Sequence, residues 1–490
     1  MALTRRVRLV VACAATLSVL APLAWLWQAS GLPPAYSVMD MGHADGGRQA
    51  GEPHHGEHRG GTTRDLTSLV ADPARRPDVV VTLIARKQRV RLASGREIDG
   101  YTFNGRSPGP QITAVAGQLV QVRLVNESVP DGVTVHWHGV DVPGGQDGVA
   151  GVTQDAVRIG RDFVYRFVVR RAGTFWYHSH QMSHGQVAGG LLGALVVRPA
   201  RPPAALDVVA LAHLYHGIRT LNGSESDLTV PAAPGATARV RVINTDNGPT
   251  PVWVTGAAWR LAAVDGTDLH GPTAVERAAV LVTAGGRADL EVTVPPGGGS
   301  VRVQIGGPLS VVVGGSAGVP PSARPAATLD LLTYGTPAPL GFDAAHPGRA
   351  FRYEMGRRPG FLDGLPGLYW TVNGRMYPDV PMFTVADGDV VRMTIVNDSG
   401  EVHPMHLHGH RAVVLARDGV PATGSPWWVD SLNVEDGESY DIAFLADNPG
   451  IWVDHCHNLP HAREGLLVHL MYENVTTPFL IGGPAGNSRE

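Results

Sequence analysis

The 490-residue chain has only two cysteines, Cys13 and Cys456, and only one lysine, Lys87. Because Cys13 lies inside an apolar N-terminal run, the folded body has a single thiol and cannot form an internal disulfide. Cys456 therefore matters as a thiol, or it is only a small buried hydrophobic residue. The 40 Lys and Arg face 44 Asp and Glu, so no basic excess is left to neutralise a nucleic-acid backbone, and we expect no nucleic-acid partner.

Long apolar runs are absent except at the N-terminus. There Arg5, Arg6 and Arg8 precede an almost uncharged stretch from Leu9 to about Ala29. This stretch is long enough to span a bilayer and has no clear small-x-small cleavage site. We expect residues 1–30 to be a signal or membrane anchor, and we favour a retained anchor over a cleaved signal. The protein is then exported and is either membrane-anchored at the cell surface or released as an extracellular or periplasmic protein.

Residues 31–77 have little apolar periodicity and are rich in Gly, Pro, His and Arg, so they are expected to form a flexible linker. The linker also carries methionine and histidine side chains, which together can hold copper transiently. A solvated tether without a metal role is the alternative. The side chains concerned are Met39, Met41, His43, His54, His55 and His58.

From residue 79 onward, short β-rich runs alternate with Gly, Pro, Asn and Asp, a pattern typical of β-sandwiches or barrels. The frame Gly117–Asn126 recurs as Gly235–Asn244 and as Gly388–Asn397. Three copies indicate three like domains, which we place at 78–200, 201–345 and 346–476, followed by a tail at 477–490.

Histidines recur at a spacing of two far more often than chance. With 21 histidines in 490 residues, about one His-x-His is expected, and the chain has five. Because residues i and i+2 of a strand point to the same face, each pair can offer two imidazoles to one cavity. The pairs are His136/His138, His178/His180, His406/His408, His408/His410 and His455/His457.

Two of these pairs fall in the first expected domain, and the other three fall in the third. In the second domain, the stretch that corresponds to His178 and His455 is Gly299–Gln304, which has no histidine. We therefore expect the second domain to keep the fold but to lack ligands, and we expect the site to lie between the first and third domains.

Cys456 stands between two of these histidines. One thiolate with two imidazoles is the ligand set of a blue copper centre, and the soft thiolate favours copper over hard cations. Zinc is the rival metal, but a closed zinc site leaves the other histidines unexplained.

Four motifs resemble the copper motifs of the multicopper oxidases: His136-Trp-His-Gly, His178-Ser-His, His403-Pro-Met-His-Leu-His-Gly and His455-Cys-His-x-x-x-His461. The resemblance spans residues 79–475 and is nearest to three-domain bacterial laccases and copper-efflux oxidases. It implies an all-β chain of three tandem cupredoxin-like Greek-key β-sandwich domains that holds four copper ions, one type 1, one type 2 and two type 3.

The resemblance also implies which residues hold each copper. His403, Cys456 and His461 would bind the type 1 copper, and His136 and His406 the type 2 copper. His138, His178 and His457 would bind one type 3 copper, and His180, His408 and His455 the other. Cys456, His455 and His457 would carry electrons from the type 1 copper to the cluster. His410 lies outside the family pattern and is interpreted as a structural or surface residue.

Three further positions bear on this resemblance. The axial type 1 position is Leu466 rather than Met, so three strong ligands are expected. Ala462 stands where many bacterial relatives have an acidic residue, which leaves that part of a proton path open. Asp147 matches the acidic proton donor of the family, although an Asp-Gly turn residue is the simpler alternative.

Together these features predict a laccase-type oxidase that uses dioxygen as acceptor. Its donor would be a small phenol or aromatic amine, with Cu(I), oxidised for copper tolerance, as the alternative. A copper nitrite reductase would have no three-copper cluster, and a cupredoxin-repeat scaffold without copper would not need filled ligand positions. Both are therefore weaker interpretations.

Overall fold

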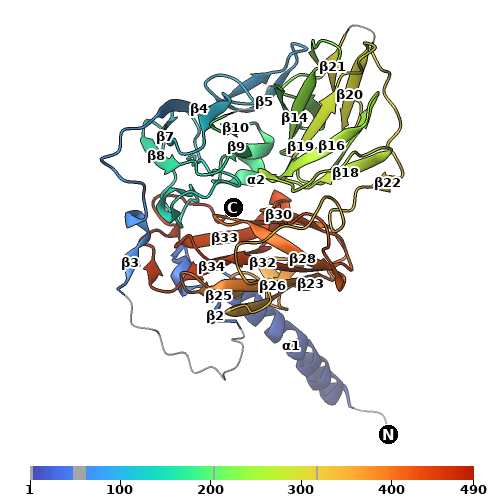
Figure 1. Ribbon diagram of the computed structural model, residues 1–490. Coiled ribbons are helices and arrows are strands. Elements are labelled where there is room, and N and C mark those ends of the chain that lie inside the picture. Colours follow the sequence, from blue (N-terminus) through green and yellow to red (C-terminus); the bar gives the residue numbers. More distant parts are fainter. Residues whose placement is uncertain (1–3, 48–61, 202–204, 316–317) are drawn as a thin grey trace.

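The computed structural model describes residues 4–47, 62–201, 205–315 and 318–490 (Figure 1). Its regular structure is mostly β-strand, as predicted, and most of the strands form three pairs of sheets. The helices are α1 (Arg5–Ala29), α2 (Ser183–Ala188) and α3 (Leu459–Arg463), with single 3-10 turns at Val38–Asp40, Leu66–Ser68 and Gly144–Gln146.

The first pair of sheets contains a four-stranded and a three-stranded sheet. In spatial order their strands are β5 (Glu97–Phe103), β4 (Val79–Arg91), β7 (Leu119–Asn126) and β8 (Asp162–Val168), and β6 (Ile112–Val115), β10 (Leu192–Arg198) and β9 (Gly173–His178).

The second pair contains two six-stranded sheets. The first has β12 (Ile218–Leu221), β11 (Leu206–Tyr215), β14 (Thr237–Asn244), β19 (Arg287–Thr293), β16 (Trp259–Val264) and β17 (Thr267–Asp268). The other has β13 (Leu228–Val230), β21 (Ser310–Gly314), β20 (Ser300–Ile305), β15 (Thr250–Thr255), β18 (Ala278–Val282) and β22 (Ala327–Thr328).

The third pair contains a six-stranded and a seven-stranded sheet. The first has β2 (His43–Asp45), β25 (Pro381–Val385), β34 (Leu467–Tyr472), β33 (Ile451–Cys456), β27 (His403–Leu407) and β31 (Ser431–Val434). The other has β24 (Leu365–Val372), β23 (Arg349–Leu362), β26 (Val390–Asn397), β32 (Ser439–Leu445), β28 (Ala412–Arg417), β29 (Val420–Pro421) and, beside β28, β30 (Trp427–Val429).

The sequence repeat has the same structural role in each pair of sheets. The opening glycines have positive φ angles of 93°, 79° and 90°, a backbone conformation that favours glycine. The strand that follows pairs in parallel with the first long strand of its sheet. Each closing asparagine is buried, and its amide donates hydrogen bonds to at least two backbone carbonyls; these residues are Asn126, Asn244 and Asn397.

Helix α1 is the one helix of the described chain that is long and apolar enough to cross a membrane, with a mean hydropathy of 2.2 over its most apolar window and no part of that window buried. A signal sequence would pass the same test. Figure 1 shows α1 leaving the third pair of sheets beside β23.

The expected linker contains short paired strands on either side of residues 48–61. Strand β1 (Ala35–Tyr36) pairs with β36 (Ile481–Gly482), β2 joins the third pair of sheets, and β3 (Arg64–Asp65) pairs with β35 (Val475–Thr476). Such short edge pairings use backbone hydrogen bonds and need no apolar period, so composition does not reveal them. His54, His55 and His58 lie outside the described residues.

Candidate metal centre

Backbone pairing brings the first two His-x-His motifs together. His136 and His178 form a bridge in which each backbone N–H donates to the other's carbonyl, at 2.8 and 3.1 Å. Between His136 and His138, the side chain of Trp137 points the other way and packs on Tyr165 and Phe167 in the core. Period-two geometry therefore sends the imidazoles to one side and the indole to the other.

Strand register brings the motifs of the third domain together. Strand β27 pairs antiparallel with β33, so that His406 lies opposite His455 and Met405 lies opposite Cys456. His408 follows at the end of β27, and His457 follows at the end of β33.

All eight predicted cluster histidines meet in one buried site, and none is more than 1% exposed. His136 Nε2 and His406 Nε2, from opposite domains, lie 3.4 Å apart. The ligand atoms of His180, His408 and His455 lie within 4.8 Å of one another. The rings of His138, His178 and His457 have centroids 4.9–5.7 Å apart. The ligand atoms of His136 also lie within 4.8 Å of those of His406 and His408, and of those of His138 and His178. The division into one type 2 and two type 3 ligand sets therefore stays a proposal.

The residues of the cluster fit metal ions chemically. Within the described part of the chain, several ring nitrogens are buried without a hydrogen-bond partner, among them His178 Nε2, His180 Nε2 and His457 Nε2. A buried polar atom without a partner is costly unless something binds it. Burial is also the largest cause that lowers the pKa of seven of these histidines, to about 3 for His180 and His457. They are thus neutral, which is the form that binds a metal.

The thiolate site lies directly beside this cluster. Cys456 Sγ is 3.5 Å from His403 Nδ1 and 3.7 Å from His461 Nδ1, and the two nitrogens are 3.2 Å apart. The outer nitrogen of each ring is held in place, His403 Nε2 by the Ser399 hydroxyl and His461 Nε2 by the Asn458 amide. Burial raises the pKa of the Cys456 thiol, so a bound cation is needed to keep it deprotonated.

Leu466 is fully buried beside this site, and its carbonyl accepts a hydrogen bond from the Cys456 N–H at 3.1 Å. Its apolar side chain offers no donor atom to a metal. We expect Leu466→Met to lower the type 1 potential, because a thioether is a weak axial ligand that favours Cu(II). A shift of about 59 mV changes a one-electron equilibrium tenfold, so poorly reducing phenols should be slowed most.

Redox titration of the blue absorption band measures this effect. Leu470→Met, the same change at a buried position within β34, is the matched control, because Leu to Met exchanges cost less than about 1.5 kcal/mol in a core. An unchanged or raised potential for Leu466→Met would place this side chain away from the copper.

Asp147 joins ligands from the two domains. Its carboxylate lies 3.1 Å from His136 Nδ1 and 2.8 Å from His408 Nδ1, and it is almost completely buried. These contacts hold the Nδ1–H of each ring and turn Nε2 toward the cluster, as carboxylate partners of metal-bound histidines commonly do. Asp147 is thus more than a turn residue. Its role as a proton donor stays a proposal.

The second domain provides no histidine of the cluster, but its residues contact the cluster and the groups that hold the histidines in place. The Arg287 guanidinium donates to both carboxylate oxygens of Asp430, at 2.5 and 2.6 Å. Asp430 Oδ1 lies 3.2 Å from His138 Nε2, and its backbone carbonyl lies 2.8 Å from His406 Nδ1. A Cβ on Gly285 would come within 2.8 Å of both His138 and His457, so this position tolerates only glycine.

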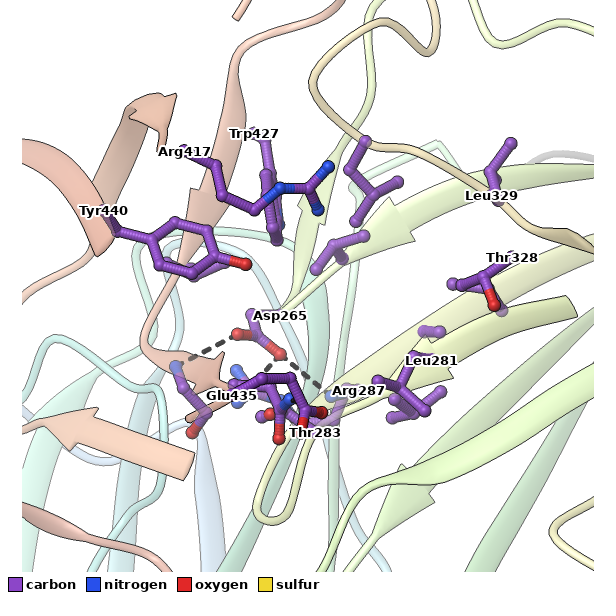
Figure 2. A pocket seen from close by; sticks show the side chains of 18 of the residues that line it. Asp265, Leu281, Thr283, Arg287, Thr328, Leu329, Arg417, Trp427, Glu435 and Tyr440 are labelled. Atoms are coloured by element: carbon purple, nitrogen blue, oxygen red, sulfur yellow. Dashed lines mark hydrogen bonds and ion pairs between the residues drawn. The ribbon is translucent and has the colours of Figure 1, made fainter. Parts of the chain in front are cut away.

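A cavity between the second and third domains extends inward to Asp265, Arg287 and Ser431. Figure 2 shows Asp265 at its floor, accepting hydrogen bonds from the backbone N–H groups of Arg287 and Ser431, with Arg417, Trp427 and Tyr440 on the opposite wall. Burial, and then the charge of Asp430, raises the pKa of Asp265. The acidic and cationic groups thus form one buried network across the domain interface.

The C-terminal residue also reaches the cluster. Glu490 Oε2 lies 3.9 Å from His180 Nε2 and 4.0 Å from His455 Nδ1, and Ser183 donates a hydrogen bond to Oε1. Burial raises the pKa of Glu490 to about 8. Residues 477–490 pack on the body of the protein, since β36 pairs with β1 and the Glu490 side chain is buried in the site.

Sequence reasoning missed Arg287, Asp430 and Glu490, because their contacts join residues that are far apart in the chain. His410 was predicted to be structural or at the surface; it is buried, with Nε2 2.7 Å from the Tyr472 hydroxyl. It packs in the core and does not face the cluster.

The chain is similar in sequence and fold to known proteins. Residues 85–202 and 352–475 match family models described as multicopper oxidase. The multicopper oxidase MmcO of Mycobacterium tuberculosis is 26% identical, covering 80% of this chain and 87% of its own. Laccase-1 of Botryotinia fuckeliana is 26% identical, covering 77% and 79%. The crystal structure of a multi-copper oxidase from Pseudomonas thermotolerans has a TM-score of 0.64 and 26% identity, covering 81% of this chain and 100% of that one.

Proposed function

The chain belongs to the multicopper oxidase family, and from that premise we propose that it is a laccase-type oxidase that couples one-electron oxidation of a phenol or aromatic amine to reduction of dioxygen to water. The observation that carries this proposal is the position of Cys456. It belongs to the thiolate site and is flanked in the chain by His455 and His457 of the cluster. A single residue's backbone thus joins the two sites.

When bound, copper supplies one-electron oxidation at the thiolate site and four-electron reduction of dioxygen at the histidine cluster. The type 1 ligands would be His403, Cys456 and His461. The eight cluster histidines would hold the other three ions, with Asp147 and Asp430 fixing their rings. Burial of all eight excludes bulk water from the reduction site.

The donor would meet the enzyme at His461, the most exposed of the type 1 ligands at 9%. Glu401 Oε2 lies 3.3 Å from His461 Nε2, and the Glu401 side chain is 46% exposed. This carboxylate can accept a hydrogen bond from a phenol hydroxyl or an aromatic amine and so orient the donor against the imidazole edge.

Cu(I), the alternative donor, prefers soft thioether or thiolate ligands. The groups that contact the outer edge of His461 are instead a carboxylate and an amide. In the described part of the linker, Met41 is buried with its sulfur 3.6 Å from the Tyr377 hydroxyl. That methionine packs in the fold, which favours the phenol or amine donor.

Copper content and reaction stoichiometry test the proposal together. We expect four copper ions per chain and one dioxygen consumed for every four one-electron donor molecules, without release of hydrogen peroxide. One or two coppers per chain would favour a nitrite reductase, and none would favour a scaffold. Kinetic comparison of Cu(I) with a panel of phenols then identifies the donor, and a clear preference for Cu(I) would overturn the laccase assignment.

A further inference from the structure

A long hairpin connects the thiolate site with the apolar N-terminal helix. It consists of β23 and β24, and its tip lies against the end of α1. The Gly364 N–H donates to Ser30 Oγ at 3.3 Å, and a Cβ on Gly364 would lie 3.2 Å from Trp27 Nε1. Figure 1 shows β23 next to the upper end of α1.

The end of the helix is held close to the body of the protein. Only residues 30–34 separate α1 from β1, which pairs with β36. Five residues span at most about 17 Å. The Tyr36 hydroxyl also lies 2.6 Å from that of Tyr377 in the third domain. The face of the protein next to α1 is therefore fixed, and it is the face that carries the hairpin.

The surface of the hairpin tip suits a bilayer. Leu365 and Leu368 are 65% and 54% exposed, and on α1 nearby Trp25 and Trp27 are 68% and 57% exposed. Between Pro359 and Trp370 the sole charged residue is Asp363, and its carboxylate pairs with Arg489 at 2.9 Å. Tryptophans gather at the headgroup level of membranes. The helix end and the hairpin tip thus lie at one interfacial level.

The same hairpin covers the type 1 ligands. Trp370 lies two residues after Leu368 on β24, a separation of about 7 Å. Its ring centroid is 4.7 Å from that of His403 and 4.5 Å from that of His461. The Arg357 guanidinium stacks on this indole at 4.3 Å. A donor that partitions into the membrane is thereby delivered to the side of the molecule where electrons enter.

We propose that the electron donor reaches the enzyme from the bilayer and is a lipid-soluble hydroquinone. This inference rests on the proposed function and on retention of α1 as an anchor. Two hydroquinones each break two O–H bonds and release two electrons and two protons, forming two quinones. One dioxygen accepts the four electrons, takes up four protons and becomes two waters, so the reaction balances without another reactant.

The kinetic test uses the full-length, copper-loaded protein in phosphatidylcholine nanodiscs. Two hydroquinones with the same ring are compared, one with a ten-carbon side chain and one without, and the ratio of their oxidation rates is measured. We expect this ratio to fall at least about fivefold when Leu365 and Leu368 are both changed to Ser, because less apolar surface then enters the lipid. Leu214→Ser, a 39% exposed leucine on β11 of the second domain, should keep the parent ratio.

A second readout needs no turnover. In a Cys13→Ser background, Leu365→Cys or Leu214→Cys is labelled with a polarity-sensitive fluorophore, since Cys456 is buried. The label at 365 should shift to the blue in nanodiscs and be quenched by spin-labelled lipid headgroups, whereas the label at 214 should not. A water-exposed label at 365, or an unchanged rate ratio, would overturn the membrane route. Failure to oxidise the soluble hydroquinone would instead overturn the proposed function.

Discussion

Cys456→Ser is expected to remove the intense blue absorption and to reduce oxidase activity by more than about a hundredfold, beyond the loss typical of outer-sphere partners of a metal. The absorption requires a thiolate bound to Cu(II), and a serine hydroxyl is a hard ligand that copper disfavours. Cys456 Sγ also lies next to Nδ1 of both His403 and His461, so its loss leaves the site with two imidazoles only. Absorption spectroscopy, copper analysis and dioxygen uptake measure the effect.

The chain contains its own control for this experiment. Cys13→Ser changes the other cysteine, which is exposed on α1, and should keep both colour and activity. The Cys456→Ser protein should lose one copper of four and retain the cluster ions, since none of the eight cluster histidines is altered. Turnover that persists in a protein confirmed to carry the change would show that electrons do not enter at Cys456.

Much of the fold could be predicted because its signals are local. The opening glycine and the closing asparagine of each repeat have the same structural role in all three domains. The glycine adopts a positive φ angle, and the asparagine amide donates hydrogen bonds to two backbone carbonyls. Alternation is equally local, since β26 buries every second residue. The predicted limits near residues 200 and 345 remain proposals that agree with where the sheet pairs begin and end.

The histidine cluster was predictable for a similar reason. Period-two spacing sets both imidazoles of a pair on one face, and pairing of β27 with β33 then needs only correct register to join His406 and His455. The supporting groups had no such signal. Arg287 and Asp430 are 143 positions apart, and nothing in either local sequence indicates that they meet. The same holds for Glu490, an ordinary C-terminal residue until folding buries it.

The linker shows the limit of composition. A stretch rich in Gly, Pro, His and Arg predicts mobility, yet β1 and β2 are held by backbone pairing with β36 and β25. Two-residue and three-residue edge strands bury too little apolar surface to leave a periodic pattern. The consequence is functional, because these pairings fix the end of α1 beside the hairpin that covers the type 1 ligands.

His136→Ala and His406→Ala are each expected to deplete one copper and to slow dioxygen reduction by more than about a hundredfold, since a direct ligand is worth more than the partners that orient it. The two Nε2 atoms lie 3.4 Å apart and come from opposite domains. Either change therefore leaves a single imidazole where two are needed. The thiolate site contains neither residue, so its blue colour should remain, and a reducing donor should still bleach it.

Bleaching and recovery of the blue absorption show which step is lost, oxidation of the donor or reduction of dioxygen. In the parent protein, dioxygen should restore the blue absorption within the time of mixing, whereas in either variant the bleached state should persist under air. His213→Ala removes a buried histidine of the second domain, hydrogen-bonded to Thr245 at 2.8 Å, and should recolour like the parent. If instead bleaching is lost while dioxygen uptake persists, His136 and His406 belong to the electron-entry site and the proposed division of ligands is wrong.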